Sequence, residues 1–105
     1  MDKKTNEYKV IISDVASEML VSHIRFLAQV SIKVADELRK EIILSAKSLQ
    51  TMPERFSYLY DTALPIKKYR KALVSKRYLL IYQIKKDTVF IDYILDCRQN
   101  YEWLL

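Results

Sequence analysis

Three apolar and aromatic runs in the last third of the chain predict strands joined by hairpins. They cover Tyr69–Val74, Tyr78–Ile84 and Thr88–Leu95, and each is rich in Tyr, Ile, Val and Leu. Only a few polar residues separate one run from the next, which is typical of consecutive antiparallel strands. Near the start of the chain, Tyr8–Ser13 predicts a further short strand, in which Tyr8, Val10 and Ile12 point to one side. The pattern does not fix which edge of the sheet this first strand joins.

Between the first strand and the later ones, the apolar spacing changes to that of two helices. Ser13 or Asp14 is suited to cap the first helix, and Ser31 the second. The expected apolar positions are Ala16, Met19, Leu20, Ile24, Phe26, Leu27 and Val30 in the first helix, and Ala35, Leu38, Ile42, Leu49 and Met52 in the second. Pro53 is expected to end the second helix, because the residue before a proline is pushed out of the helical region. The short link predicts that the two helices lie antiparallel.

The resulting order, β-α-α-β-β-β, predicts an α+β fold in which a helical hairpin packs on one face of a small antiparallel sheet. With 105 residues, the chain is expected to form a single domain over residues 1–105. Residues 53–67 are expected to be irregular, with Phe56, Tyr58 and Tyr60 covering one end of the core. On the sheet, Tyr78 and Tyr82 share a face and are expected to lie in the core or at its rim.

Composition narrows the possible functions. Half of the residues are apolar and 30% are charged, which is typical of a soluble globular protein. Glycine is absent, and this excludes nucleotide sites built on a glycine-rich loop. Because the chain holds one Cys and one His, Cys97 and His23, neither an internal disulfide nor a zinc site is expected. We expect no cofactor, no membrane segment and a cytoplasmic location.

The net charge of +5 favours an anionic partner, such as nucleic acid, the ribosome, an anionic membrane or an acidic protein. No acidic residue occurs between Asp61 and Asp87, and this stretch carries eight basic residues: Lys67, Lys68, Arg70, Lys71, Lys76, Arg77, Lys85 and Lys86. The simplest interpretation is a solvated surface. A functional interpretation is that Arg98 converges with Arg70 and Lys71 on a phosphate.

Convergent cations of this kind, together with Tyr101, would suit RNA cleavage by the neighbouring 2′-hydroxyl, because its transition state gathers negative charge on the phosphate. Such cleavage needs no metal ion. A tyrosine or lysine could transfer the proton only if its pKa were lowered from about 10. His23 is more consistent with a packed or half-exposed helix residue than with a catalyst, and Cys97 lacks a nearby histidine that would make it a nucleophile.

The sequence resembles the RelE/ParE superfamily of bacterial type II toxins over nearly its full length. The matching features are the strand YKVIIS with a capped helix after it, Leu49 and Pro53 at the end of the helical hairpin, Tyr69-Arg70, the run RYLLIYQI and the ending VFIDYILDCRQNY. The resemblance implies a β-α-α-β-β-β toxin that is neutralised by a small acidic antitoxin encoded beside it. It further implies that a RelE-like chain cuts mRNA in the ribosomal A site, whereas a ParE-like chain poisons DNA gyrase and is not a nuclease.

The resemblance assigns candidate roles to individual residues. Under the RelE interpretation the catalytic residues are Arg70, Lys71, Arg77, Arg98 and Tyr101. Leu79 stands where RelE-like chains carry an arginine, and Asp96 stands where ParE-like chains often carry a histidine. The sequence-based hypothesis is therefore a ribosome-dependent mRNA endonuclease whose partners are the ribosome and mRNA. Gyrase inhibition is the first alternative, and a basic binding module without activity is the second.

Overall fold

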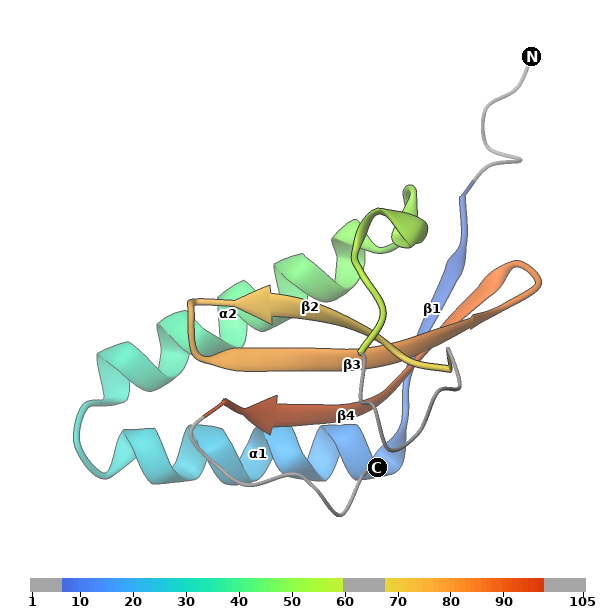
Figure 1. The fold of residues 1–105 in the computed structure, drawn as a ribbon. Helices are drawn as coiled ribbons and strands as arrows, with labels where there is room; N and C mark the ends of the chain where they lie inside the picture. Colours follow the sequence, from blue (N-terminus) through green and yellow to red (C-terminus); the bar gives the residue numbers. More distant parts are fainter. Residues whose placement is uncertain (1–6, 60–67, 98–105) are drawn as a thin grey trace.

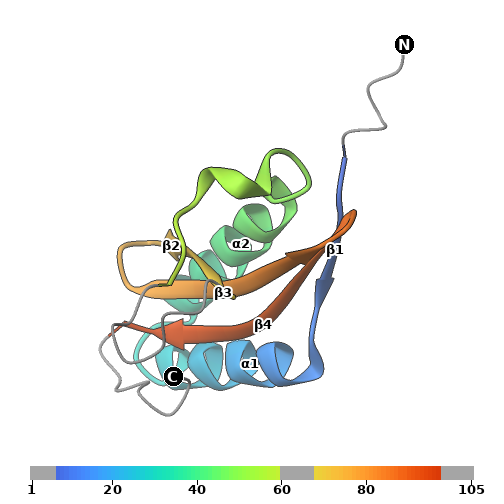
Figure 2. The ribbon, with the colours of Figure 1, turned by 45° about the vertical axis from the view of Figure 1, so that its right-hand side comes forward.

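Two helices pack on one face of a four-stranded sheet (Figures 1 and 2). The computed structural model describes residues 7–59 and 68–97. Its elements are β1 (Lys9–Ile12), α1 (Asp14–Ala28), α2 (Ile32–Ser48), the short 3₁₀ helix η2 (Pro53–Arg55), β2 (Arg70–Val74), β3 (Tyr78–Lys85) and β4 (Thr88–Asp96). The predicted order of strands and helices is confirmed.

The strands lie in the order β1-β4-β3-β2. β2, β3 and β4 form the predicted antiparallel meander, but β1 runs parallel to β4, so the sheet is mixed rather than wholly antiparallel. At the end of β1, the Ser13 amide donates to the Ile91 carbonyl oxygen at 2.9 Å and the Ser13 hydroxyl to the Asp92 carbonyl oxygen at 3.1 Å. These bonds fix the point at which the chain leaves the sheet and enters α1.

Both helix starts are capped as predicted. The Ser13 hydroxyl oxygen accepts from the Ala16 amide at 3.0 Å, and the Ser31 hydroxyl oxygen accepts from the Val34 amide at 3.2 Å. The prediction that Pro53 ends the second helix is wrong, because α2 ends at Ser48. Pro53 instead opens η2, where its missing N–H costs nothing.

The main core lies between the helices and the sheet. It comprises Ala16, Leu38, Ile42, Ala46 and Leu49 from the helices, and Ala72, Val74, Tyr78, Leu80, Tyr82, Val89, Ile91 and Ile94 from the strands. The prediction for Tyr78 and Tyr82 is therefore confirmed. The prediction that Phe26, Val30 and Met52 extend the apolar stripe is wrong, because all three side chains are exposed.

The opposite face of the sheet carries a smaller apolar cluster. Its buried members are Leu79, Ile81 and Leu95, and Leu59, Tyr69 and Tyr93 pack against them. The segment that precedes β2 runs along the edge of that strand, where the Lys71 amide donates to Ser57 and the Leu59 amide to Tyr69. In this segment Phe56 packs against the main core and Tyr58 is half-buried, whereas Tyr60 lies outside the described residues. None of the described helices is long and apolar enough to span a membrane.

Candidate functional site

Arg70 begins β2 and lies on the side of the sheet that faces the helices, opposite Tyr82. Its Nη1 atom donates to the carbonyl oxygens of Glu54 and Phe56 at 3.2 and 2.7 Å. The guanidinium carbon lies 4.1 Å from the centroid of the Tyr58 ring. These contacts join the start of β2 to the segment that includes η2. Both hydrogen bonds come from Nη1, so this nitrogen of Arg70 is engaged within the fold.

Lys71 follows Arg70 on the same strand, so its side chain points to the other face of the sheet. It is half-buried there, opposite Ile81. The positive charge of Lys71 acts on the Cys97 thiol. Burial raises the pKa of that thiol, as does the Asp96 carboxylate, and Lys71 opposes the rise only in part. A raised pKa keeps Cys97 protonated, in agreement with the expectation that it is not a nucleophile.

Arg77 lies at the other end of the β2–β3 hairpin from Arg70. Arg70 pairs with Tyr82 and Val74 with Tyr78, so about four residue steps, or roughly 13 Å, separate Arg70 from the turn that precedes Arg77. The Arg77 guanidinium carbon lies 5.4 Å from the centroid of the Tyr78 ring, and its Nη2 atom donates weakly to the Tyr78 hydroxyl at 3.4 Å. The three described candidate cations thus occupy three separate places and do not converge.

Arg77 also lines a cavity of about 200 Å³ between the β2–β3 turn and α2. Glu37 and Glu41 of α2 line the opposite wall. The Nε atom of Arg77 is buried and has no hydrogen-bond partner within the described residues. Because two carboxylates share this cavity with a single guanidinium, an entering phosphate would meet repulsion as well as attraction.

The structure reveals a polar cluster at this end of the sheet that the sequence analysis did not identify. The Nε2 atom of His23 lies 2.8 Å from the Ile94 carbonyl oxygen, and the His23 ring lies 5.2 Å from the Tyr78 ring. Tyr78 pairs with Asp96, which is buried at the end of β4. His23 is distant from these residues in sequence, and only the packing of α1 along β4 brings it there. No local pattern in the sequence could have revealed this contact.

Two candidate residues, Arg98 and Tyr101, lie outside the described residues, so their roles stay predictions. Leu79, at the position where RelE-like chains carry an arginine, is 7% exposed and packs with Ile81 and Leu95. This strand position therefore lies in an apolar cluster and supplies no charge.

The environment of two described tyrosines opposes proton transfer. Burial raises the pKa of Tyr69 to about 12, with a further contribution from the nearby Asp92 carboxylate. Burial likewise raises the pKa of Tyr82 to about 12, and its hydroxyl donates to the Pro53 carbonyl oxygen at 2.7 Å. A general base near neutral pH would need the opposite shift. Among the described residues, no group of three or more His, Cys, Asp or Glu side chains is placed to hold a metal ion.

Comparison with known proteins places the chain in a family. The family model of the ParE toxin of the type II toxin-antitoxin system parDE matches residues 10–101. A solved structure described as the chromosomal ParDE toxin-antitoxin system from P. aeruginosa is similar in fold, with a TM-score of 0.70 and 12% sequence identity over 87% of this chain and 97% of that chain. No curated protein matches the sequence. Because the family model spans nearly the whole chain, this protein belongs to the ParE toxin family of type II toxin-antitoxin systems.

Proposed function

We propose that this toxin inhibits DNA gyrase and does not cleave RNA. The observation that carries the proposal is the match to the ParE family model over residues 10–101. The resemblance to the superfamily implies that its ParE-like members act on gyrase. The proposal reverses the order suggested by the sequence, in which ribosome-dependent mRNA cleavage came first.

The arrangement of the basic residues also favours gyrase inhibition over RNA cleavage. RNA cleavage by the 2′-hydroxyl requires several donors within hydrogen-bonding distance of one phosphate, about 3 Å. Arg70 donates to two backbone carbonyl groups, Lys71 lies on the other face of the sheet, and Arg77 lies at the far end of the hairpin. These three cations are better suited to a broad electrostatic surface than to a single catalytic centre.

We infer that the basic surface attracts a protein instead. A small acidic antitoxin would be drawn to a chain with a net charge of +5, and opposite charges accelerate such association. The antitoxin would then hold the toxin inactive until it is degraded or displaced. Lys68, Lys76, Lys85 and Lys86 are exposed and are the first residues we expect it to approach.

The deciding experiment applies the purified toxin to two targets in parallel. With gyrase and relaxed plasmid, we expect loss of ATP-dependent supercoiling and accumulation of linear DNA when the reaction is stopped with detergent and protease. With programmed ribosomes, we expect mRNA of unchanged length. Prior addition of the cognate antitoxin should abolish the effect on gyrase.

The opposite pattern would overturn the proposal. Ribosome-dependent cuts that end in a 2′,3′-cyclic phosphate, together with unaffected gyrase, would establish the nuclease interpretation and return Lys71, Arg77, Arg98 and Tyr101 to a catalytic role. Absence of both activities from a folded chain would favour the basic binding module.

A further inference from the structure

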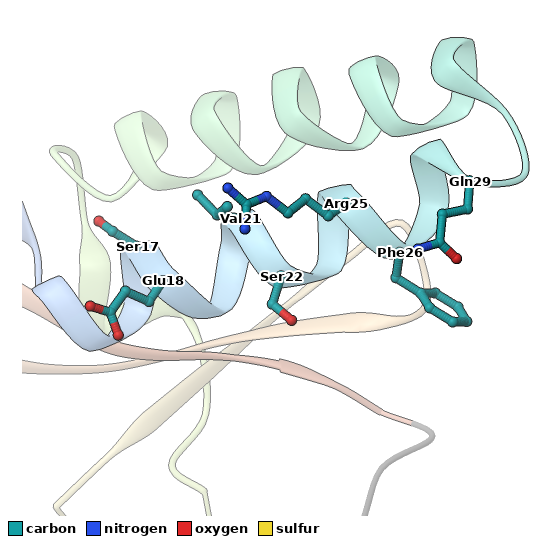
Figure 3. Close-up of a pocket in the computed structure, with 7 residues that line it drawn as sticks. All are labelled: Ser17, Glu18, Val21, Ser22, Arg25, Phe26 and Gln29. Carbon is teal, nitrogen blue, oxygen red and sulfur yellow. The ribbon is translucent and has the colours of Figure 1, made fainter.

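The outer face of α1 carries a shallow groove that none of the functions above uses. It has a volume of about 590 Å³ and is lined by Ser17, Glu18, Val21, Ser22, Arg25, Phe26 and Gln29 (Figure 3). Figure 3 shows Val21 and Arg25 directed toward α2, with Ser22 and Phe26 on the other side of the groove. We call this surface the α1 groove. It lies on the side of α1 that faces away from the sheet.

The α1 groove combines exposed apolar side chains with two residues of opposite charge, Glu18 and Arg25. Val21 is 45% exposed and Phe26 61%, and Val15, two residues before the first groove residue Ser17, is 52% exposed. Within the part of the chain that the structure describes, neither Glu18 nor Arg25 forms an ion pair or a side-chain hydrogen bond. Exposed apolar side chains on α1 are thus interspersed with two opposite charges that have no partner among residues 7–59 and 68–97.

The spacing of these residues is self-complementary. Glu18 and Arg25 are about two helical turns apart and lie nearly on one line along α1. Consider a second copy of α1 that runs antiparallel to the first and is related to it by a two-fold axis at the midpoint of this pair, between Val21 and Ser22. Glu18 of each copy then lies opposite Arg25 of the other. Both ion pairs form in the same arrangement.

A second pair of residues points to the same axis. Val15 and Phe26 are about three helical turns apart and also lie nearly on one line. Their midpoint, between Leu20 and Val21, differs from that of Glu18 and Arg25 by one residue, or about 1.5 Å along the helix. The antiparallel arrangement that pairs the charges therefore also places Phe26 of each copy against Val15 of the other. Ser22 lies close to the axis, and its small side chain allows the two helices to approach.

We propose that the α1 groove binds a second copy of this chain, with the two α1 helices antiparallel and related by a two-fold axis near Ser22. The proposal does not depend on gyrase as the target. A contact between two single helices is smaller than the roughly 1,200–2,000 Å² that stable complexes bury. The dimer should therefore dissociate at concentrations on the order of micromolar.

Charge reversal tests the pairing directly. Sedimentation equilibrium over a range of protein concentrations should show a monomer–dimer equilibrium for the wild-type chain. Glu18→Arg alone and Arg25→Glu alone each place like charges opposite one another, and each should weaken association by about tenfold or more. The double variant Glu18→Arg/Arg25→Glu restores both pairs and should associate within about threefold of the wild type. Thermal melting of each variant confirms that it is folded.

Disulfide trapping tests the position of the axis. In a Cys97→Ser background, which removes the native thiol, Ser22→Cys should give a covalent dimer on mild oxidation. Ser17→Cys in the same background is the matched control, because residue 17 lies away from the axis and should cross-link much less.

Three outcomes would overturn the proposal. The first is a folded chain that stays monomeric at all concentrations. The second is a dimer that the charge reversals do not weaken, that the double variant does not restore, or that Ser17→Cys traps as well as Ser22→Cys does. In the third, the single reversals leave self-association unchanged but weaken binding of the cognate antitoxin, and the groove then belongs to the antitoxin.

Discussion

The guanidinium group of Arg70 is stacked on the ring of Tyr58, 4.1 Å from its centroid, while its Nη1 atom donates to the carbonyl oxygens of Glu54, within η2, and of Phe56, just after it. This relationship gives a residue from the basic cluster a structural role. It joins β2 to the segment before it, and an aromatic ring and two carbonyl groups compensate the charge.

Arg70→Ala should therefore lower the free energy of unfolding by about 1–3 kcal/mol, through loss of charge-assisted hydrogen bonds and the cation–π contact. The matched control is Arg39→Ala, which removes an exposed ion pair with Asp36 and should cost less than about 1 kcal/mol. Urea denaturation of both variants measures the difference. Equal stabilities would show that Arg70 does not hold the segment in place and would return it to the candidate site.

The turns provide a second prediction, because the chain has no glycine and uses other residues in the left-handed region. Ser75, Lys76 and Lys86 have φ angles of 53°, 62° and 56°. Glycine adopts such angles without the steric cost that a Cβ atom brings. Lys86→Gly should therefore raise the unfolding free energy by about 0.5–1 kcal/mol. Lys85→Gly, at the end of β3, is the control and should be destabilising, and thermal denaturation compares the two.

The features that the sequence predicted correctly depend on residues that are close together in the chain. Ser13 and Ser31 cap their helices through bonds that span three residues, and the strands follow from runs of neighbouring apolar side chains. The place of β1 depends instead on pairing with β4, from Lys9 with Thr88 to Ile12 with Ile91. Such contacts between distant segments leave no periodic signal in either segment.

The candidate site was harder to predict for the same reason. The adjacent basic residues Arg70 and Lys71 suggested one cluster. Successive side chains of a strand point to opposite faces of the sheet, however, so these two side chains are separated. The hydrogen-bond acceptors of Arg70 are backbone carbonyl groups, which any sequence would supply. His23 meets Tyr78 only because α1 packs along β4. The environments of Arg70 and His23 therefore came from the tertiary fold and not from their neighbours in the chain.

The buried tyrosines predict a loss of stability at high pH. The pKa of Tyr82 in the folded chain is about 12, above the value of about 10 expected when the chain is unfolded. The unfolded chain therefore releases the proton first, and stability is fully present below pH 10 and falls as the pH rises toward 12. Tyr69, with a pKa also near 12, should contribute in the same direction.

Urea denaturation between pH 8 and pH 11 tests this prediction. Tyr82→Phe should be less stable at pH 8, because the bond to the Pro53 carbonyl oxygen is lost, but its stability should decline less steeply with pH. The double variant Tyr69→Phe/Tyr82→Phe should decline least. An unchanged slope in the double variant would mean that other groups cause the alkaline loss.

The last prediction concerns Leu79, where RelE-like chains carry an arginine. If the missing cation alone prevented RNA cleavage, Leu79→Arg should restore cleavage on programmed ribosomes in a stable protein. The structure predicts a different result. Leu79 is buried against Ile81 and Leu95, so an arginine there would place an unpaired charge in an apolar cluster and should lower the free energy of unfolding by about 3 kcal/mol or more.

Two control variants separate the loss of packing from the added charge. Leu79→Met keeps the volume and should cost less than about 1.5 kcal/mol. Leu73→Arg adds the same charge at an exposed position of β2 and should change stability by less than about 0.5 kcal/mol. Urea denaturation and the ribosome assay on all three variants separate the effects. A stable Leu79→Arg variant that cuts mRNA would contradict this prediction, and would show that the sheet can accept a catalytic arginine and that the missing cation alone separates this toxin from a nuclease.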